Sequence, residues 1–252
     1  KNMDKPNVDQ GTKLEGDLLE LSMATDPDGD NLHVKSVDGT LIGDGTIVPI
    51  EYKDHGVVAH LKIDADGKFT LIANNSNDYV NSLAEGKHIE LDVPFIVSDE
   101  GKPPKHAEGT LTIKVKGAND KPTLDKRYIG EQVTEVMDDM KPGDKPGTEN
   151  PTGNFIEATG AKDPDNGDSL FLKAKIDGKF VLLDIGKDGV TLEGRYGDLF
   201  IDQDFNYEYI LDQDAVNHLK SHESVREAFW FSFADRADGK GKMSETFDLW
   251  IR

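Results

Sequence analysis

The chain has 252 residues, which is enough for one large domain or two domains of ordinary size. It has 49 acidic residues against 29 Lys and Arg, a net charge of −20, and this argues against nucleic acid and anionic lipid as partners. It has no cysteine, which excludes disulfides, zinc–thiolate sites and thiol catalysis.

No apolar run approaches the roughly 20 residues that a membrane-spanning helix needs, so we expect a chain that is not embedded in a membrane. There is no signal peptide, and the chain begins at Lys1 without an initiator methionine. We therefore expect it to be a piece of a longer protein.

Three sequence blocks of the first half return in the same order in the second half, at offsets between 136 and 138 residues. These are residues 16–28 and 153–165, 61–66 and 199–204, and 78–83 and 214–219. The sequence Asn119-Asp120-Lys121-Pro122 lies between the copies, and a similar sequence opens the chain at Asn2. We predict two tandem domains, 1–118 and 119–252, the second with an insertion near 137–152 that we expect to be a surface loop.

Period-2 alternation of apolar and polar residues predicts β-strands through most of the chain. In chain order, the alternating segments are 61–63 with 69–71 around the turn Asp64–Gly67, then 89–97, 111–115, 229–233 and 247–251. The blocks 78–83 and 214–219 predict one or two turns of helix. One polar and one apolar face per strand is typical of antiparallel sheets packed as a sandwich, so the predicted fold class is all-β with two tandem antiparallel sandwiches.

The segment Gly109–Pro122 resembles the closing strand and linker of cadherin-like repeats of the VCBS or Ig-like type, which occur in large bacterial RTX-type adhesins. The segments Tyr196–Leu199, Tyr207–Tyr209 and Asp212–Val216 resemble the middle hairpin and crossover of such repeats. The resemblance implies Greek-key sandwiches, an extracellular location on a bacterial cell surface, and a role in adhesion or biofilm formation as an array that holds an adhesive tip away from the cell.

Acidic residues predict a Ca²⁺ site at one end of each domain, because calcium takes six to eight oxygen ligands, several of them carboxylate. In a sandwich of this strand order, the loop after the second strand, the loop before the last strand and the incoming linker lie at the same end. The candidate ligands are Asp4, Asp26, Asp28 and Asp99 in the first copy, and Asn119, Asp120, Asp163, Asp165 and Asp235 in the second. Asp-Pro-Asp-Gly is also good turn chemistry, and a purely structural turn stays open as the alternative.

We expect the chain to be a monomeric, calcium-rigidified extender whose partners are neighbouring repeats of the same chain, since a short linker would otherwise act as a hinge. The alternative is a module of the adhesin that binds a surface glycan or peptide, centred on the second repeat. Trp230 and Trp250 favour this alternative because they fall on the outward face of the last two strands.

An enzyme is not expected. His218 and His222 fall four residues apart on a predicted helix, but Leu219 stands where a zinc protease needs glutamate. There is no serine elbow and no phosphate-binding glycine loop.

Overall fold

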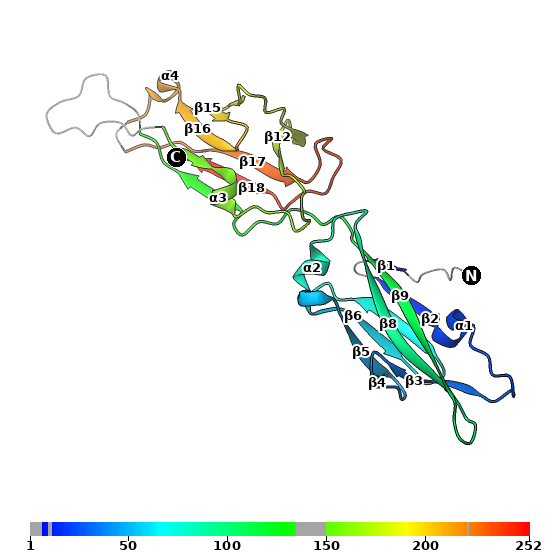
Figure 1. Ribbon diagram of the computed structural model, residues 1–252. Helices are drawn as coiled ribbons and strands as arrows, with labels where there is room; N and C mark the ends of the chain where they lie inside the picture. Colours follow the sequence, from blue (N-terminus) through cyan, green and yellow to red (C-terminus); the bar gives the residue numbers. More distant parts are fainter. Residues whose placement is uncertain (1–6, 10–11, 135–149, 221) are drawn as a thin grey trace. The chain divides into compact units, whose positions relative to one another are not determined.

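The computed structural model describes residues 7–9, 12–134, 150–220 and 222–252. The chain divides into two compact units, Lys1–Asn119 and Asp120–Arg252, here called unit 1 and unit 2. Strands dominate both units, and each helix is a single turn or little more (Figure 1).

Unit 1 is a sandwich of two sheets. The first has the order β1 (Asn7–Asp9), β9 (His106–Lys116), β8 (His88–Asp99), β3 (Leu32–Val37) and β4 (Thr40–Leu41). The second has the order β2 (Lys13–Asp17), β7 (Lys68–Ala73), β6 (Val57–Ile63) and β5 (Thr46–Glu51). The chain crosses between the sheets through α1 (Leu18–Ser22) and α2 (Asp78–Asn81), and a short 3₁₀ turn, η1 (Lys53–His55), joins β5 to β6 within the second sheet.

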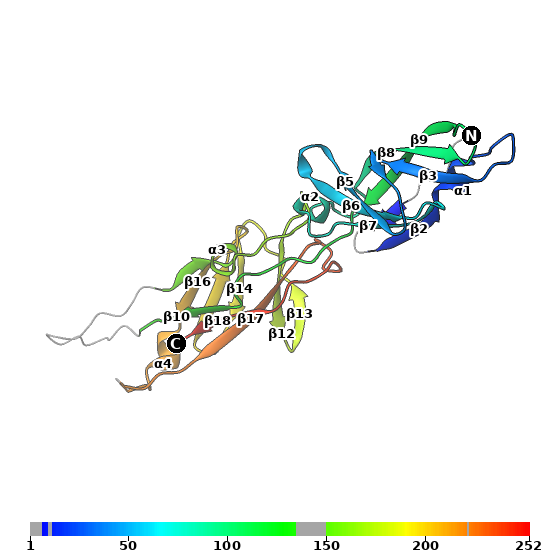
Figure 2. The same ribbon diagram turned by 90° about the horizontal axis from the view of Figure 1, so that it is seen from below.

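Unit 2 has the same architecture. Its first sheet has the order β10 (Tyr128–Glu131), β18 (Phe247–Ile251), β17 (Glu227–Ala234), β12 (Phe171–Ile176) and β13 (Lys179–Leu182), and these strands lie side by side in Figure 2. Its second sheet has the order β11 (Thr152–Asn154), β16 (Asn206–Leu211), β15 (Gly197–Ile201) and β14 (Val190–Glu193). The crossover helices are α3 (Phe155–Thr159) and α4 (Gln213–Val216).

The predicted all-β fold of two tandem Greek-key sandwiches is confirmed. One detail differs from the antiparallel prediction: β1 pairs in parallel with β9, and β10 pairs in parallel with β18. In each unit the first strand therefore lies beside the last strand and closes one edge of the sheet. Three and four residues are too few to show a pattern in the sequence.

Alternating burial builds the cores. In β8 the alternate residues from Ile89 to Val97 are buried and pack against Leu61 and Leu71 of the opposite sheet. In unit 2 the core is richer in aromatic rings: Phe231 stacks on Phe247 with ring centroids 5.5 Å apart. The core residues of β17 thus lie directly before the loop that contains Asp235.

Side-chain caps start the short helices. Asp17 accepts hydrogen bonds from two N–H groups at the start of α1, and Asn154 does the same for α3. Asp212 caps α4, which ends at Val216 after one turn. The prediction that His218 and His222 share a helix is therefore wrong, because the cap starts the helix at Gln213 and it stops before either histidine.

Candidate metal centre

Five aspartates gather at one end of unit 2, and we call them the acidic cluster: Asp120, Asp163, Asp165, Asp168 and Asp235. Asp163, Asp165 and Asp168 lie in the loop between α3 and β12, and one carboxylate oxygen of each lies within 4.8 Å of the others. The loop is tightly turned, because Asp163 Oδ1 accepts the N–H of Asp165 at 2.9 Å and Gly167 has a φ of +95°. A local turn thus brings three negative charges together.

The chain entering unit 2 joins this loop. The N–H of Asp120 donates to Asp165 Oδ2 at 2.7 Å, and Thr123 and Lys162 exchange backbone hydrogen bonds of 2.8 and 3.1 Å. Asp235 follows directly after β17 and is buried, and its Oδ2 accepts the N–H of Lys242 at 3.1 Å. Segments far apart in the sequence therefore converge on one set of carboxylates.

Burial distinguishes this cluster from an ordinary acidic surface. Asp165 is only 2% exposed. Asp163 Oδ2 and Asp165 Oδ1 are buried and accept no hydrogen bond from any described residue. A buried polar atom without a partner costs roughly 1–3 kcal/mol, and more if it is charged, so native proteins seldom leave one without a ligand.

The electrostatics point the same way. Burial raises the pKa of Asp163 to about 6, and the charges of Asp165, Asp168 and Asp235 add to this effect. Burial also raises the pKa of Asp165, with further contributions from Asp120, Asp168 and Asp235. The site therefore disfavours the ionised form of these carboxyls compared with a solvated aspartate, and a bound cation would reverse that preference.

The donor set fits a hard cation. The cluster offers only oxygen atoms, with neither histidine nor cysteine, and oxygen ligands suit Ca²⁺ or Mg²⁺ rather than zinc or copper. Flexible coordination by six to eight oxygens, as calcium prefers, suits ligands that come from a loop, a strand end and an incoming segment. Asp163, Asp165 and Asp168 would hold the ion, with Asp120 and Asp235 close by.

The corresponding acids of unit 1 lie in a different environment. Asp26 Oδ1 accepts the N–H groups of Asp28 and Asp30 at 2.8 and 3.2 Å, which is an ordinary Asx turn. Asp28 is exposed and pairs with the ammonium of Lys105 at 3.3 Å. Asp99 is buried, and its Oδ1 accepts the N–H of Lys105 at 2.7 Å. In unit 1 a lysine side chain thus supplies positive charge beside these acids.

The two remaining predicted ligands are Asp4 and Asn119. Asp4 lies outside the described residues. Asn119 is the last residue of unit 1 and is half-buried. The insertion near 137–152 also falls outside the described residues, except for Asn150 to Thr152 at its end; Thr152 begins β11.

Sequence reasoning missed Asp168 and Lys105. A signal for Asp168 was present, because Asp163, Asp165 and Asp168 place three acids within six residues, with Gly167 available for the turn. The first copy has Asn31 at the position equivalent to Asp168. Lys105 gave no signal, since its pairing with Asp28 spans 77 residues.

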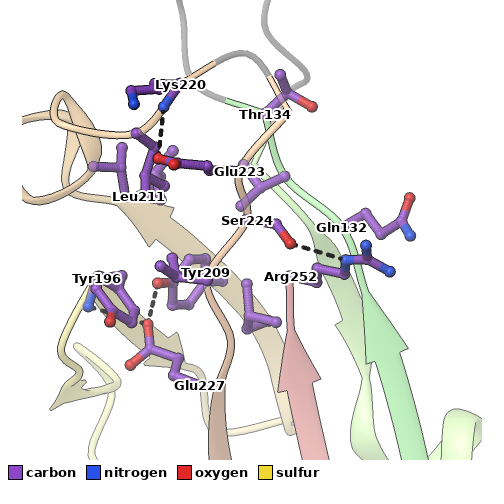
Figure 3. A pocket seen from close by; sticks show the side chains of 15 residues that line it. Gln132, Thr134, Tyr196, Tyr209, Leu211, Lys220, Glu223, Ser224, Glu227 and Arg252 are labelled. Carbon is purple, nitrogen blue, oxygen red and sulfur yellow. Dashed lines mark hydrogen bonds between the residues drawn. The ribbon is translucent and has the colours of Figure 1, made fainter.

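A second feature is a cavity of about 770 Å³ at the other end of β17 (Figure 3). Its floor includes Leu211 and Tyr209, and Glu227 lies at its base. Glu227 accepts the hydroxyl of Tyr209 and the N–H groups of Arg195 and Tyr196, the latter two at 2.8 and 3.3 Å. Because three donors within the protein already use this carboxylate, its evident role is to hold the strands together at this end.

The predicted tryptophans lie on the first sheet of unit 2. Trp230 of β17 is 42% exposed, and Trp250 of β18 is half-buried. Both side chains are on the face away from the core, since their neighbours Phe231 and Leu249 are fully buried.

No family model matches the sequence, and no curated protein matches it. Solved structures with a similar arrangement of strands include the extracellular cadherin domains 1–5 of protocadherin gamma B2, with 14% identity, a TM-score of 0.42, and coverage of 88% of this chain and 39% of that one. Mouse cadherin-23 domains EC22–24 match with 15% identity, a TM-score of 0.43, and coverage of 98% and 62%. Mouse protocadherin-24 domains EC1–3 match with 12% identity, a TM-score of 0.41, and coverage of 88% and 57%.

The chain thus spans between about two fifths and three fifths of the length of these three structures. No helix in the described part of the chain is long and apolar enough to cross a membrane. A likeness at such low identity concerns the arrangement of strands and says nothing of binding partners.

Proposed function

We propose that the chain is a calcium-stiffened structural segment of an extracellular adhesion protein, in which the acidic cluster of unit 2 holds a Ca²⁺ ion. The observation that carries the proposal is the pair of buried carboxylate oxygens, on Asp163 and Asp165, that accept no hydrogen bond within the described residues. A cation beside them would supply the missing partner and remove the repulsion within the cluster.

The position of the cluster gives the ion a mechanical role. Asp120 opens unit 2 and donates its N–H to Asp165, so the cluster includes the first residue of the unit. An ion held there would fix this incoming segment to the loop before β12 and to the end of β17. The part of the linker that belongs to unit 2, Asp120 to Pro122, would then lose freedom, as an extender in a chain of repeats requires.

The ion would also make folding depend on the surroundings. A ligand that binds only the folded state stabilises it by mass action, so the chain would be loose where calcium is scarce and stiff where it is plentiful. This behaviour suits a protein exported to a bacterial cell surface, with monomeric repeats arranged end to end in an adhesin that supports attachment or biofilm formation.

For unit 1 we propose a weaker site formed by Asp26, Asp28 and Asp99, with Asp4 as a further ligand. Lys105 already lies beside Asp28, and calcium would have to displace its ammonium group. We therefore expect unit 1 to bind calcium with the lower affinity of the two units. Asn119 would add a carbonyl or amide oxygen near the start of unit 2.

Calorimetric titration with calcium, combined with small-angle scattering of the full chain, tests the proposal. We expect a tight calcium-binding event, accompanied by a narrower distribution of interatomic distances and a changed maximum dimension relative to the chelated protein. Asp165→Asn should lose both effects. Asp28→Asn, at the equivalent position of unit 1, is the matched control and should keep the tight event. If calcium leaves the maximum dimension of the wild-type chain unchanged, the stiffening role is wrong.

A further inference from the structure

The outward face of the first sheet of unit 2 includes two tryptophans and a tyrosine, with an exposed lysine and an aspartate beside them. We call Tyr128, Trp230, Trp250, Lys175 and Asp248 the aromatic face. Tyr128 is 63% exposed and Trp230 is 42% exposed. In a sheet that buries its other face in the core, large exposed rings are a feature that folding alone does not explain.

Strand pairing places these groups in one row across the sheet. Tyr128 pairs with Asp248, and Asp248 pairs with Trp230. The ammonium of Lys175, on the next strand, lies 5.7 Å from the centroid of the Trp230 ring. Trp250 lies two residues along β18 from Asp248. The row therefore alternates aromatic, acidic, aromatic and basic groups.

Neighbouring groups hold each ring in place. The indole N–H of Trp250 donates to Asp248 Oδ2, and Lys175 contacts the ring of Trp230. Beside Trp250, Gly130 leaves room for Tyr128, since a Cβ at position 130 would lie 2.6 Å from the Tyr128 hydroxyl. The Tyr128 ring thus folds over Gly130 along the sheet surface. Rings held in this way lose little conformational entropy when a ligand binds.

Another part of the same sheet face is covered by a loop, whereas no described loop covers the part with the aromatic rings. Further along β12, Lys173 is buried, and its ammonium donates to the carbonyl of Gly239 at 2.7 Å. The loop between β17 and β18 therefore covers that part of the face. It leaves the part with the two tryptophans exposed or half-exposed.

We propose that the aromatic face binds a neutral, extended, β-linked glycan. Aromatic rings stack on the C–H faces of sugar rings, while a carboxylate and an ammonium between them accept and donate hydrogen bonds to hydroxyl groups. The strands that carry Tyr128 and Trp230 lie two strand spacings apart, about 9.6 Å, which is close to the length of two pyranose units in an extended chain. One acid and one base leave the row without net charge, although the whole chain carries −20.

A peptide fits this surface less well. A peptide that adds to a sheet pairs with an unpaired strand edge, whereas both tryptophans lie on β17 and β18, which are interior strands with partners on both sides. The proposal concerns a surface outside the acidic cluster, and it stands or falls independently of calcium binding.

Tryptophan fluorescence of the full chain tests it directly, because both tryptophans of the sequence belong to the aromatic face. The probes are cellohexaose and chitohexaose, which are β-linked, and maltohexaose, which is α-linked and curved. We expect a saturable fluorescence change with at least one β-linked hexamer and none with maltohexaose. Trp230→Ala should weaken binding of that hexamer by about tenfold or more, measured by calorimetry.

Two further variants sharpen the result. Gly130→Val should displace the Tyr128 ring and weaken binding, while Ile72→Ala, which removes an exposed apolar residue of unit 1, should leave it unchanged. Asp165→Asn should also bind the hexamer, so that loss of the calcium site and loss of the glycan site are told apart. The proposal is overturned if neither β-linked hexamer binds, or if Trp230→Ala binds as well as wild type. It is equally overturned if the face instead joins two copies of the chain in sedimentation experiments.

Discussion

Replacing Asp165 by asparagine should have opposite effects on the stability of unit 2 with and without calcium. The side chain is 2% exposed, and its Oδ1 accepts no hydrogen bond from a described residue. Asparagine has the same shape, so its carbonyl oxygen can still accept the N–H of Asp120. Its neutral amide N–H₂ replaces the oxygen that accepts no hydrogen bond from the described part of the chain and takes one negative charge out of the cluster. The variant therefore removes a buried charge without opening a cavity.

The magnitudes follow from the burial. An unsatisfied buried polar group costs about 1–3 kcal/mol, so metal-free Asp165→Asn should gain about 1–2 kcal/mol of unfolding free energy. For a unit of this size that is a rise in melting temperature of about 4–8 °C. For the wild type, calcium at a hundred times its dissociation constant adds about 2.7 kcal/mol, or about 10 °C. The variant, having lost one carboxylate ligand, should show little of that rise.

Differential scanning calorimetry of the full chain, in chelator and in calcium, measures both effects. Asp28→Asn is the control, because Asp28 is exposed and paired with Lys105, and it should leave the transition of unit 2 in place. Two results would refute the reasoning: a metal-free variant that melts below the metal-free wild type, or a calcium-induced rise as large in the variant as in the wild type. Either would mean that the buried carboxylates are satisfied within the protein.

Three other predictions concern unit 2. Burial raises the folded-state pKa of Asp163 to about 6, above its ordinary value of 3.8. The metal-free unit should therefore be more stable near pH 5 and lose stability as the pH rises through 6. Calorimetry across this range should show a flatter dependence of melting temperature on pH for Asp163→Asn. Calcium should bind more weakly below pH 6, where protons compete for the same carboxylate. Tyr209→Phe removes the hydroxyl that Glu227 accepts and should cost about 1–2 kcal/mol in urea unfolding. Burial and the charge of Glu227 raise the pKa of Tyr209, so this cost should be the same at pH 7 and pH 9, and a cost that vanishes at pH 9 would contradict it.

Most of the strand framework is predictable because its signal is local. The alternation from Ile89 to Val97 gives β8, and the turn at Asp64–Gly67 gives the hairpin of β6 and β7. The parallel pairs escaped prediction because β1 and β10 have only three and four residues, and their partners lie at the opposite end of each unit's sequence. Pairing of that kind depends on the closed sandwich rather than on any pattern within the strand.

The acids of the candidate site are visible in the sequence, but their environments are not. Asp28 and Asp165 occupy the same place in the same Asp-Pro-Asp turn, yet one is exposed and the other is 2% exposed. Residues distant in sequence differ between the two environments: the ammonium of Lys105 pairs with Asp28 from 77 positions away, and the N–H of Asp120 donates to Asp165 from 45 positions away. An expectation built on the turn alone treats the two copies as equivalent.

The two units separate acidity from the burial on which the proposed metal site depends. In unit 1, water and the Lys105 ammonium stabilise Asp28, and the turn is complete without an added ion. In unit 2, Asp165 has lost its water, and one of its oxygens accepts no hydrogen bond within the described chain. The favourable free energy of binding a cation therefore comes from burial of the carboxylates and not from their number. Water already stabilises the charge of a solvated carboxylate, so a cation adds little there. By this reasoning the net charge of −20 is a poor guide to calcium binding, and a buried aspartate in an otherwise ordinary turn is a good one.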